Sequence, residues 1–160
     1  MEQVIPGEEL AKQRLNALIF SYTLLVKHLK EEGVERAKVK RASDKVWAVL
    51  GSQAADQMKP LFPEPVNIEA LHQAGQIAEA VHGMEVRQEV AQTEIYTEFV
   101  KCPWQDAYIA LGIPEEWRLC PSGHVAFTET MYAGLNPDAK YSLTKDMPTG
   151  AAVCAARTWI

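Results

Sequence analysis

The sequence predicts an α+β fold: N-terminal helices packed on a small antiparallel sheet of about four strands, with short helices between two hairpins. Two observations carry this prediction. Residues 8–83 repeat apolar side chains every three or four positions, as amphipathic helices do. Beyond residue 84, short segments alternate apolar and polar side chains, as strands do. We therefore expect a single domain over residues 1–160, with a helical half at 1–83 and a sheet- and cysteine-bearing half at 84–160.

Three helices are expected in the first half of the chain. The first spans Glu8–Glu32 and is ended by Gly33; its inward face comprises Leu15, Leu18, Ile19, Tyr22, Leu25, Val26 and Leu29. The second spans Val34–Lys59, begins with a basic, solvated face, and directs inward Ala42, Val46, Val49, Leu50, Ala54 and Met58. Asn67 is the expected N-cap of the third helix, which Gly83 closes.

Two hairpins are expected in the second half. The segments Glu85–Val90 and Glu94–Val100 form the first hairpin. Short helices follow at Pro103–Leu111 and Ser122–Ala133. The last hairpin consists of residues 139–145 and 151–160, joined by a loop whose proline and glycine suit a turn.

Composition and charge exclude several classes of protein. Apolar residues make up 48% of the chain, and 16 Lys and Arg against 21 Asp and Glu leave a net charge of −5. No nucleic-acid partner is expected, because binding phosphates needs a basic face. No apolar run approaches the roughly 20 residues of a membrane span. Residues 1–6 show no secretory signal, so we expect a cytoplasmic protein with no membrane partner.

Three cysteines, Cys102, Cys120 and Cys154, are the main candidates for chemistry. Their number is odd, which disfavours a disulfide scaffold and favours free thiols. Two of them begin matching pentapeptides, Cys-Pro-Trp-Gln-Asp at 102–106 and Cys-Pro-Ser-Gly-His at 120–124. Proline favours the first position of a helix, so each cysteine is expected at an N-cap, where the helix start favours the thiolate. Either motif alone also fits an inert, packed cysteine.

The fifth residue of each motif lies one helical turn beyond its cysteine, on the same side. His124 could therefore exchange a proton with Cys120. Asp106 disfavours a thiolate at Cys102 because like charges repel, so its expected role is to carry protons or to orient a ligand. Trp104 could form the floor of a substrate pocket, although packing is the usual role of Trp.

A metal site is the alternative use of the same side chains. Cys102, Cys120, Cys154 and His124 make a Cys3His set, which would suit zinc or another soft, thiolate-bound metal. The spacing between the cysteines contains no C-x-x-C knuckle and does not favour this assignment. We therefore predict no cofactor and keep a thiolate-bound metal as the alternative.

The C-terminal third resembles the L-2-amino-thiazoline-4-carboxylic acid hydrolase-like family. The resemblance rests on an ordered set: Cys102-Pro103-Trp104, Gly112, Cys120, His124, Asn136-Pro137, and Gly150 four residues before Cys154. It implies an α+β protein that opens a small ring containing sulfur and nitrogen, with the three cysteines and His124 as functional residues and Asn136 and Cys154 near the substrate. The domain is also broadly similar to ligand-binding domains of the vinyl-reductase type, which hold apolar or tetrapyrrole-like ligands between helices and sheet.

Two functions follow as hypotheses. The first is a cysteine-dependent hydrolase acting on a C–N or C–S bond of a small cyclic substrate, with Cys102 or Cys120 as nucleophile and His124 as proton carrier. The alternative is a non-catalytic domain that binds or senses a small ligand or a soft metal between helices and sheet. The long first helix could in addition pair with a second copy of the chain to form a homodimer.

Overall fold

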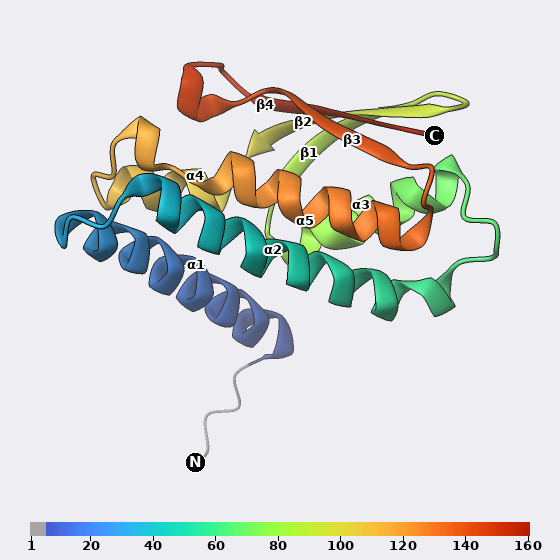
Figure 1. Ribbon diagram of the computed structural model, residues 1–160. Coiled ribbons are helices and arrows are strands. Elements are labelled where there is room, and N and C mark those ends of the chain that lie inside the picture. The colour runs from blue at the N-terminus through green and yellow to red at the C-terminus, as the bar shows by residue number, and fades with distance from the viewer. Residues whose placement is uncertain (1–5) are drawn as a thin grey trace, which may run out of the picture.

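A computed structural model describes residues 6–160 and confirms the α+β fold (Figure 1). In chain order its elements are α1 (Gly7–Glu31), α2 (Arg36–Met58), α3 (Ile68–Val81), β1 (Glu85–Val90), β2 (Glu94–Lys101), α4 (Pro103–Ala110), α5 (Cys120–Leu135), β3 (Lys140–Lys145) and β4 (Cys154–Trp159). Short 3-10 turns lie at Lys59–Leu61, Glu115–Trp117 and Met147–Thr149. The expectation of no secretory signal concerns residues 1–6, of which 1–5 lie outside the described part of the chain.

The four strands form one antiparallel sheet in the order β1-β2-β4-β3. Both predicted hairpins are present, and the pairing of β2 with β4 joins them. In this pairing Phe99 lies opposite Cys154. Because Cys102 follows directly after the end of β2, the register brings Cys102 and Cys154 to the same end of the sheet.

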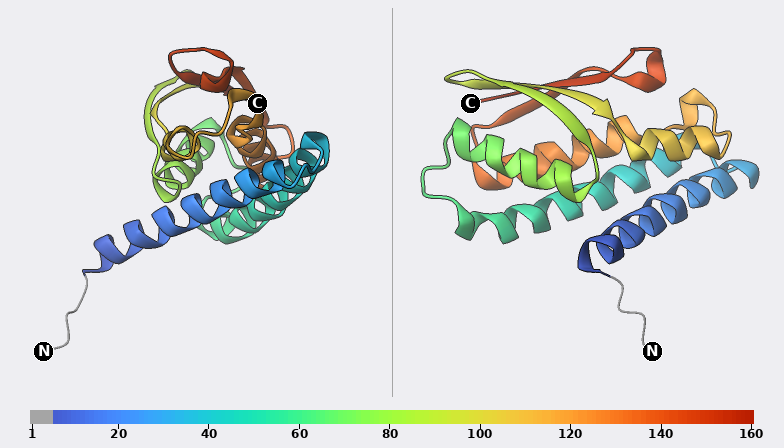
Figure 2. Two further views of the ribbon diagram at one scale, coloured as in Figure 1. Left: turned by 90° about the vertical axis from the view of Figure 1, so that its left-hand side faces the viewer. Right: turned by 180° about the vertical axis from the view of Figure 1, so that it is seen from behind.

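The sheet and the helices form layers. Helices α3 and α5 cover one face of the sheet, α2 packs on α5, and α1 lies outermost (Figures 1 and 2). The main core fills the space between these layers with side chains from α2, α3, α5 and the sheet, including Leu71, Ile95, Phe127 and Met131. A smaller core lies around Tyr108 of α4 and Val26 of α1. Both depend on removing apolar surface from water.

Close approach of α2 and α5 requires small residues at their crossing. A Cβ atom added to Gly51 would lie 2.3 Å from the carbonyl oxygen of Phe127. A Cβ atom added to Gly123 would lie 2.6 Å from the Trp47 ring. These two glycines therefore let α5 approach α2 closely enough for Trp47 to reach the start of α5.

The prediction of the apolar faces of α1 and α2 is partly wrong. Six positions expected to face inward are exposed, namely Leu18, Leu25, Val46, Val49 and Leu50 at 40–57% and, with them, Ala42. Helix α1 diverges from α2 toward its N-terminal end (Figure 2), so the two apolar faces meet only near the adjoining ends of the helices. There the Tyr22 hydroxyl and Ser43 Oγ share a 2.5 Å hydrogen bond. The predicted homodimer stays a prediction.

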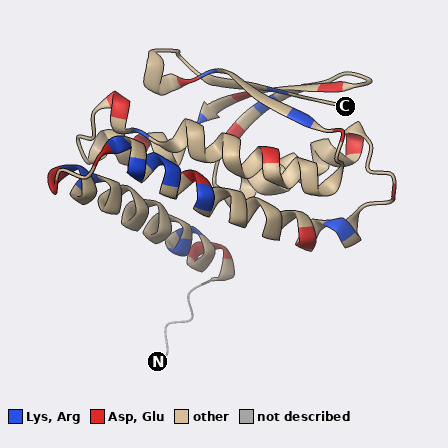
Figure 3. Ribbon diagram, in the orientation of Figure 1, with Lys and Arg blue, Asp and Glu red and all other residues tan. Residues whose placement is uncertain are grey.

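Other expectations from the sequence concern helix ends and surface charge. Asn67 caps α3 as predicted, because its side chain accepts a hydrogen bond from the Ala70 N–H at 3.0 Å. The basic residues of the first half of α2 are mostly exposed, as the solvated-face interpretation expects, and Figure 3 shows them along this part of the helix. Over residues 6–160, none of the helices combines the length and the apolarity that a bilayer span requires.

Candidate functional site

Three adjoining compartments lie between the sheet and the helices, and together they are called the cavity. The outer compartment is lined by the three cysteines with Pro121 and Leu143. The aromatic compartment is lined by Tyr22, Trp47, His82, Trp104 and Phe127. The inner compartment is lined mainly by α3, α5 and the sheet, and it includes Glu79, Thr97, Tyr132, Tyr141 and Thr158. Met84 and His124 line all three compartments, so these side chains stand where the compartments meet.

The three cysteines come together in the outer compartment from three different elements. Cys102 is the N-cap of α4, as predicted, with φ −135° and ψ 106°. Cys120 is the first residue of α5, whose N-cap is Leu119, so the predicted N-cap position of Cys120 is wrong by one residue. Cys154 begins β4, and its Sγ accepts a hydrogen bond from the Met147 N–H at 3.3 Å.

The two Cys-Pro helices contact each other beside the cysteines. The Cys120 Sγ donates to Oε1 of Gln105, 3.9 Å away, and Gln105 is the fourth residue of the first motif. Gln105 is itself buried. The thiol of Cys120 is thus directed toward α4, although His124 lines the same two compartments as Cys120.

The expectation that the helix starts would favour thiolates is wrong for this structure. Burial raises the pKa of all three thiols above the usual value, for Cys120 well above it. At Cys102 the N–H groups of Gln105 and Trp104 oppose this effect, while the nearby charge of Asp106 adds to it. Desolvation of the sulfur outweighs the helix start because the surrounding wall is apolar. All three cysteines are therefore neutral thiols at neutral pH.

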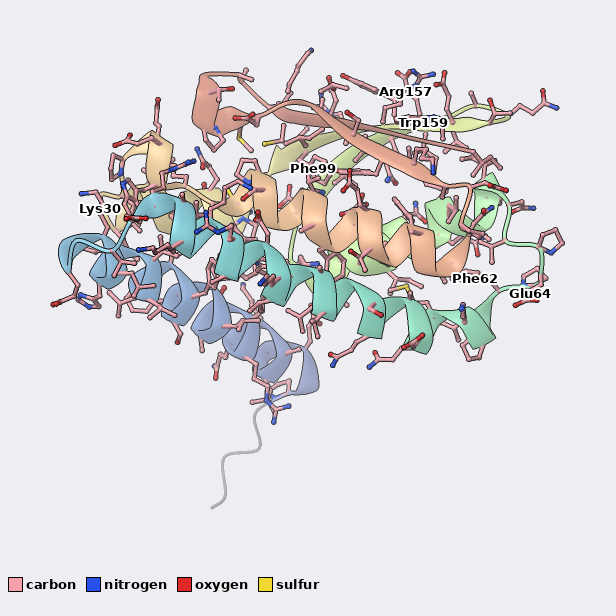
Figure 4. The ribbon with its side chains drawn as sticks, viewed as in Figure 1. Lys30, Phe62, Glu64, Phe99, Arg157 and Trp159 are labelled. Atoms are coloured by element: carbon pink, nitrogen blue, oxygen red, sulfur yellow. The ribbon has the colours of Figure 1, made fainter. Side chains whose placement is uncertain are left out.

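His124 contributes an imidazole at the meeting point of the compartments. Its ring makes edge-to-face contacts with Phe99, at 4.9 Å between centroids, and with Tyr141, at 5.7 Å. Figure 4 shows Phe99 between the sheet and the helices. Burial lowers the pKa of His124 to about 4, so the ring is neutral at neutral pH. Its Nε2 atom is buried and has no hydrogen-bond partner among residues 6–160.

The aromatic compartment is built from side chains of four helices and from the end of α3. The Trp47 and Trp104 rings meet edge to face at 5.1 Å, and Tyr22 contacts both rings at 5.8 Å. The His82 ring packs on Phe127 at 4.8 Å. Nε1 of Trp104 is a second buried nitrogen without a partner in the described chain. The arrangement forms an apolar, aromatic wall with few polar atoms, as is usual for sites that hold small ligands.

Glu79 is the functional candidate that sequence reasoning missed. It is 8% exposed, and burial raises its pKa to about 7. Nε2 of Gln88 donates to its two carboxyl oxygens at 3.2 and 3.3 Å. The signal was present in the sequence, because Glu79 stands eight positions after Leu71 and therefore on the apolar face of α3. A carboxyl group on such a face is seldom buried without a reason.

The other predicted site residues lie in different places. Trp104 lines the aromatic compartment, as described above. Asp106 is exposed on α4 and does not line the cavity. Asn136 ends α5, where its Nδ2 donates to the Val66 carbonyl at 2.7 Å and its Oδ1 accepts from the Asp138 N–H at 2.8 Å. The roles predicted for Asp106 and Asn136 toward a substrate stay predictions.

The metal alternative needs the four ligands to converge on one point. Over residues 6–160, no three His, Cys, Asp or Glu side chains are arranged to hold a metal ion. The contact of Cys120 with Gln105 and that of Cys154 with a backbone N–H direct these sulfurs to different partners. The geometry of the outer compartment thus does not favour the Cys3His set.

Comparison with known proteins agrees with the fold and identifies the family. No curated protein matches the sequence. Among solved structures, the phenol-responsive sensory domain of the transcription activator PoxR, solved with phenol, is similar with a TM-score of 0.64 and 13% identity over 88% of this chain and 73% of that one. Trafficking protein particle complex subunit 3 from Naegleria fowleri, covalently bound to palmitic acid, is similar with a TM-score of 0.51 and 15% identity over 92% and 95% of the two chains. At such identities the likeness shows the fold alone.

The family model for L-2-amino-thiazoline-4-carboxylic acid hydrolase matches residues 12–158. The match includes the three helices of the first half as well as the cysteine-bearing segment on which the resemblance was based. The chain therefore belongs to the L-2-amino-thiazoline-4-carboxylic acid hydrolase family.

Proposed function

We propose that the protein binds a small, cyclic, mostly apolar molecule in this cavity. The observation that carries the proposal is the buried Nε2 of His124, which has no partner within residues 6–160 and lies where all three compartments meet. Leaving a buried polar atom unpaired costs about 1–3 kcal/mol. A ligand with one polar group near His124 would recover that cost while its ring contacts the aromatic wall.

The size of the cavity supports a small ligand that displaces Met84. The outer and aromatic compartments have volumes of about 30 Å³ each and the inner one about 10 Å³. Since one water needs ~10–15 Å³ by this measure, the outer and aromatic compartments each have room for about two waters and the inner one for about one at most. Met84 separates the compartments, and methionine is flexible and adapts readily to a ligand. Movement of this one side chain would join the compartments into a space for a ring.

The two structural relatives agree with this proposal. The sensory domain was solved with phenol, a small aromatic molecule with one hydroxyl group. The trafficking subunit was solved with covalently bound palmitic acid. Both molecules are largely apolar, and an apolar interior is what the present cavity offers.

Thermal denaturation with a panel of small cyclic compounds tests the proposal. Phenol, thiophene and 2-aminothiazoline are each added at rising concentration to the wild-type protein and to a His124→Leu variant. A ligand that binds only the folded state raises the Tm with its concentration. We expect a concentration-dependent rise for the wild type that is reduced in the variant. Val49→Ala, in the exposed part of α2, is the matched control. No rise with any compound would contradict the proposal.

A second function, hydrolysis by a cysteine, is favoured by the presence of three thiols and His124 around one compartment. In this scheme a thiol adds to the C=N carbon of a ring, forming an S–C bond, while its proton passes through His124 to the ring nitrogen. The ring C–S bond of the adduct then breaks, and the ring sulfur leaves as a thiol that takes a proton from the adduct nitrogen. Water adds to the same carbon, and the bond from this carbon to the cysteine breaks, which restores the protein thiol and leaves a carbonyl group in the product. Because His124 is neutral, it can accept a proton. The predicted role of Asp106, to orient the substrate amine, belongs to this scheme.

Incubation with L-2-amino-thiazoline-4-carboxylic acid tests the second function. Mass spectrometry would detect a product heavier than the substrate by one water. We expect the product with the wild type and its loss in one of the variants Cys102→Ser, Cys120→Ser and Cys154→Ser. Product formation that survives in all three variants would exclude a cysteine nucleophile, whereas a complete absence of product leaves ligand binding as the function.

A further inference from the structure

The inner compartment contains a buried carboxyl group without a positive partner. Glu79 lies on α3, and the described part of the chain shows no ion pair to it. Its hydrogen-bond donor is the neutral amide of Gln88. Two carboxyl oxygens offer about four acceptor positions, so most of their capacity is unused. A buried acid of this kind calls for a donor from outside the protein.

The groups that face Glu79 from the neighbouring elements are neutral. Tyr132 of α5 and Tyr141 of β3 both have a raised pKa because of burial, with the Glu79 charge contributing. His82 and His124 have a lowered pKa through burial, and both line the same compartment. His72 reaches the network only through Gln88, whose Oε1 lies 3.0 Å from its Nε2. No cation of the described chain therefore balances the charge.

The space beside Glu79 suits a single small group. The compartment volume is about 10 Å³, close to the smallest space that holds one water. The Tyr132 hydroxyl and the Glu79 carboxyl group both lie near Gly75. A Cβ atom added to Gly75 would lie 2.5 Å from the Tyr132 hydroxyl and 3.9 Å from Oε1 of Glu79. The Tyr141 hydroxyl, another wall of this compartment, is buried without a partner among the described residues. A group with several N–H donors would satisfy both the carboxyl and the phenol.

We propose that the inner compartment is a specificity site for a basic nitrogen, which places an ammonium or amidinium group of the ligand against Glu79. This inference rests on the proposed binding function and names the chemistry of the ligand. The ring of the ligand occupies the aromatic compartment, and its nitrogen passes Met84 and His82, which line both compartments. Burial raises the pKa of Glu79 to about 7, so an arriving cation meets a carboxyl group that ionises by releasing a proton.

Three ligands of the same shape test the proposal: benzylamine, benzyl alcohol and ethylbenzene, which differ in one terminal group. Their Kd values are measured by isothermal titration calorimetry at pH 8 for the wild type and for Glu79→Gln. An opposite charge shifts a carboxyl pKa by 1–3 units, which corresponds to a preference of about 10- to 1000-fold for the ionised acid. We expect the wild type to bind benzylamine at least about tenfold more tightly than ethylbenzene. Glu79→Gln should abolish this preference.

A matched control and a second measurement complete the design. Glu69→Gln changes an exposed acid of the same helix and should keep the preference. At pH 7, repeating the titration in two buffers of different ionisation enthalpy should show that the wild type releases protons with benzylamine and none with ethylbenzene. This measurement needs no variant of Glu79.

The outcomes separate the two proposals. Binding of ethylbenzene and benzyl alcohol without a preference for benzylamine overturns the inference and leaves the binding function intact. Failure of all three ligands to bind overturns both. A preference that persists in Glu79→Gln assigns the nitrogen to another group and overturns the role of Glu79.

Discussion

Replacing Glu79 with glutamine should change the pH dependence of folding stability. Burial raises the pKa of the carboxyl group from 4.5 to about 7 in the folded protein. The folded state therefore holds a proton that the unfolded chain releases near its ordinary pKa. The stability contributed by this group is complete below pH 4.5 and is lost as the pH rises through about 7. The side-chain amide of the Glu79→Gln variant does not titrate and can still accept the hydrogen bond from Gln88.

The magnitude follows from the size of the pKa change. Each pKa unit corresponds to about 1.4 kcal/mol, so full ionisation of Glu79 lowers the free energy of unfolding by about 3 kcal/mol. Part of this loss has already occurred at pH 5. Between pH 5 and 8.5 the stability of Glu79→Gln relative to the wild type should therefore rise by roughly 2–3 kcal/mol.

Urea unfolding followed by far-ultraviolet circular dichroism measures this difference at half-unit steps of pH. The difference between the two proteins removes the effects of the other titrating groups, which both proteins share. Glu69→Gln, an exposed change on the same helix, is the matched control. If the difference for Glu79→Gln stayed constant within about 0.5 kcal/mol, Glu79 would not be desolvated and the description of the inner compartment would be wrong.

Three further predictions concern other parts of the structure. Burial lowers the pKa of His124 to about 4, so this residue contributes stability above pH 6.5 that is lost as the pH drops through 4. In urea unfolding between pH 7 and 4, His124→Gln should therefore lose up to about 3 kcal/mol less stability than the wild type. An equal loss of stability in both proteins refutes this prediction. Gly51→Ala, which places a Cβ atom 2.3 Å from the Phe127 carbonyl oxygen, should destabilise the protein by about 2–3 kcal/mol, whereas Ser52→Ala on the exposed side should not. At pH 7.5 iodoacetamide should alkylate the thiols of the folded protein at least about tenfold more slowly than it alkylates glutathione, because partial burial raises their pKa and keeps them protonated. One thiol that reacts faster than glutathione contradicts the raised pKa values.

Local patterns in the sequence were sufficient to predict the helices and strands of the fold. The change from helical to alternating periodicity at residue 84 separates the helices from the strands, and the structure has β1 beginning at Glu85. The proline after each cysteine indicated a helix start, and α4 and α5 begin within one residue of those prolines. Asn67 was identified as a cap from its position before an apolar repeat. Each of these features depends on interactions between residues less than one or two turns apart.

Long-range packing decided what periodicity could not show. The apolar residues Val46, Val49 and Leu50 repeat as if buried, yet they are exposed because α1 turns away from α2. The spacing of apolar residues within each helix does not predict where two packed helices diverge from each other. Conversely, the register of β2 with β4 and the packing of α5 on the sheet place three cysteines that lie far apart in the chain around one compartment.

The sequence by itself determined which elements form, which residues cap them and where the thiols stand along the chain. Only the tertiary structure decided that the thiols are protonated, that His124 is neutral and that Glu79 is buried without a cation from the described chain beside it. The physical reason is that element formation depends on neighbouring residues, whereas the charge state of a side chain depends on how much water the whole fold removes from around it.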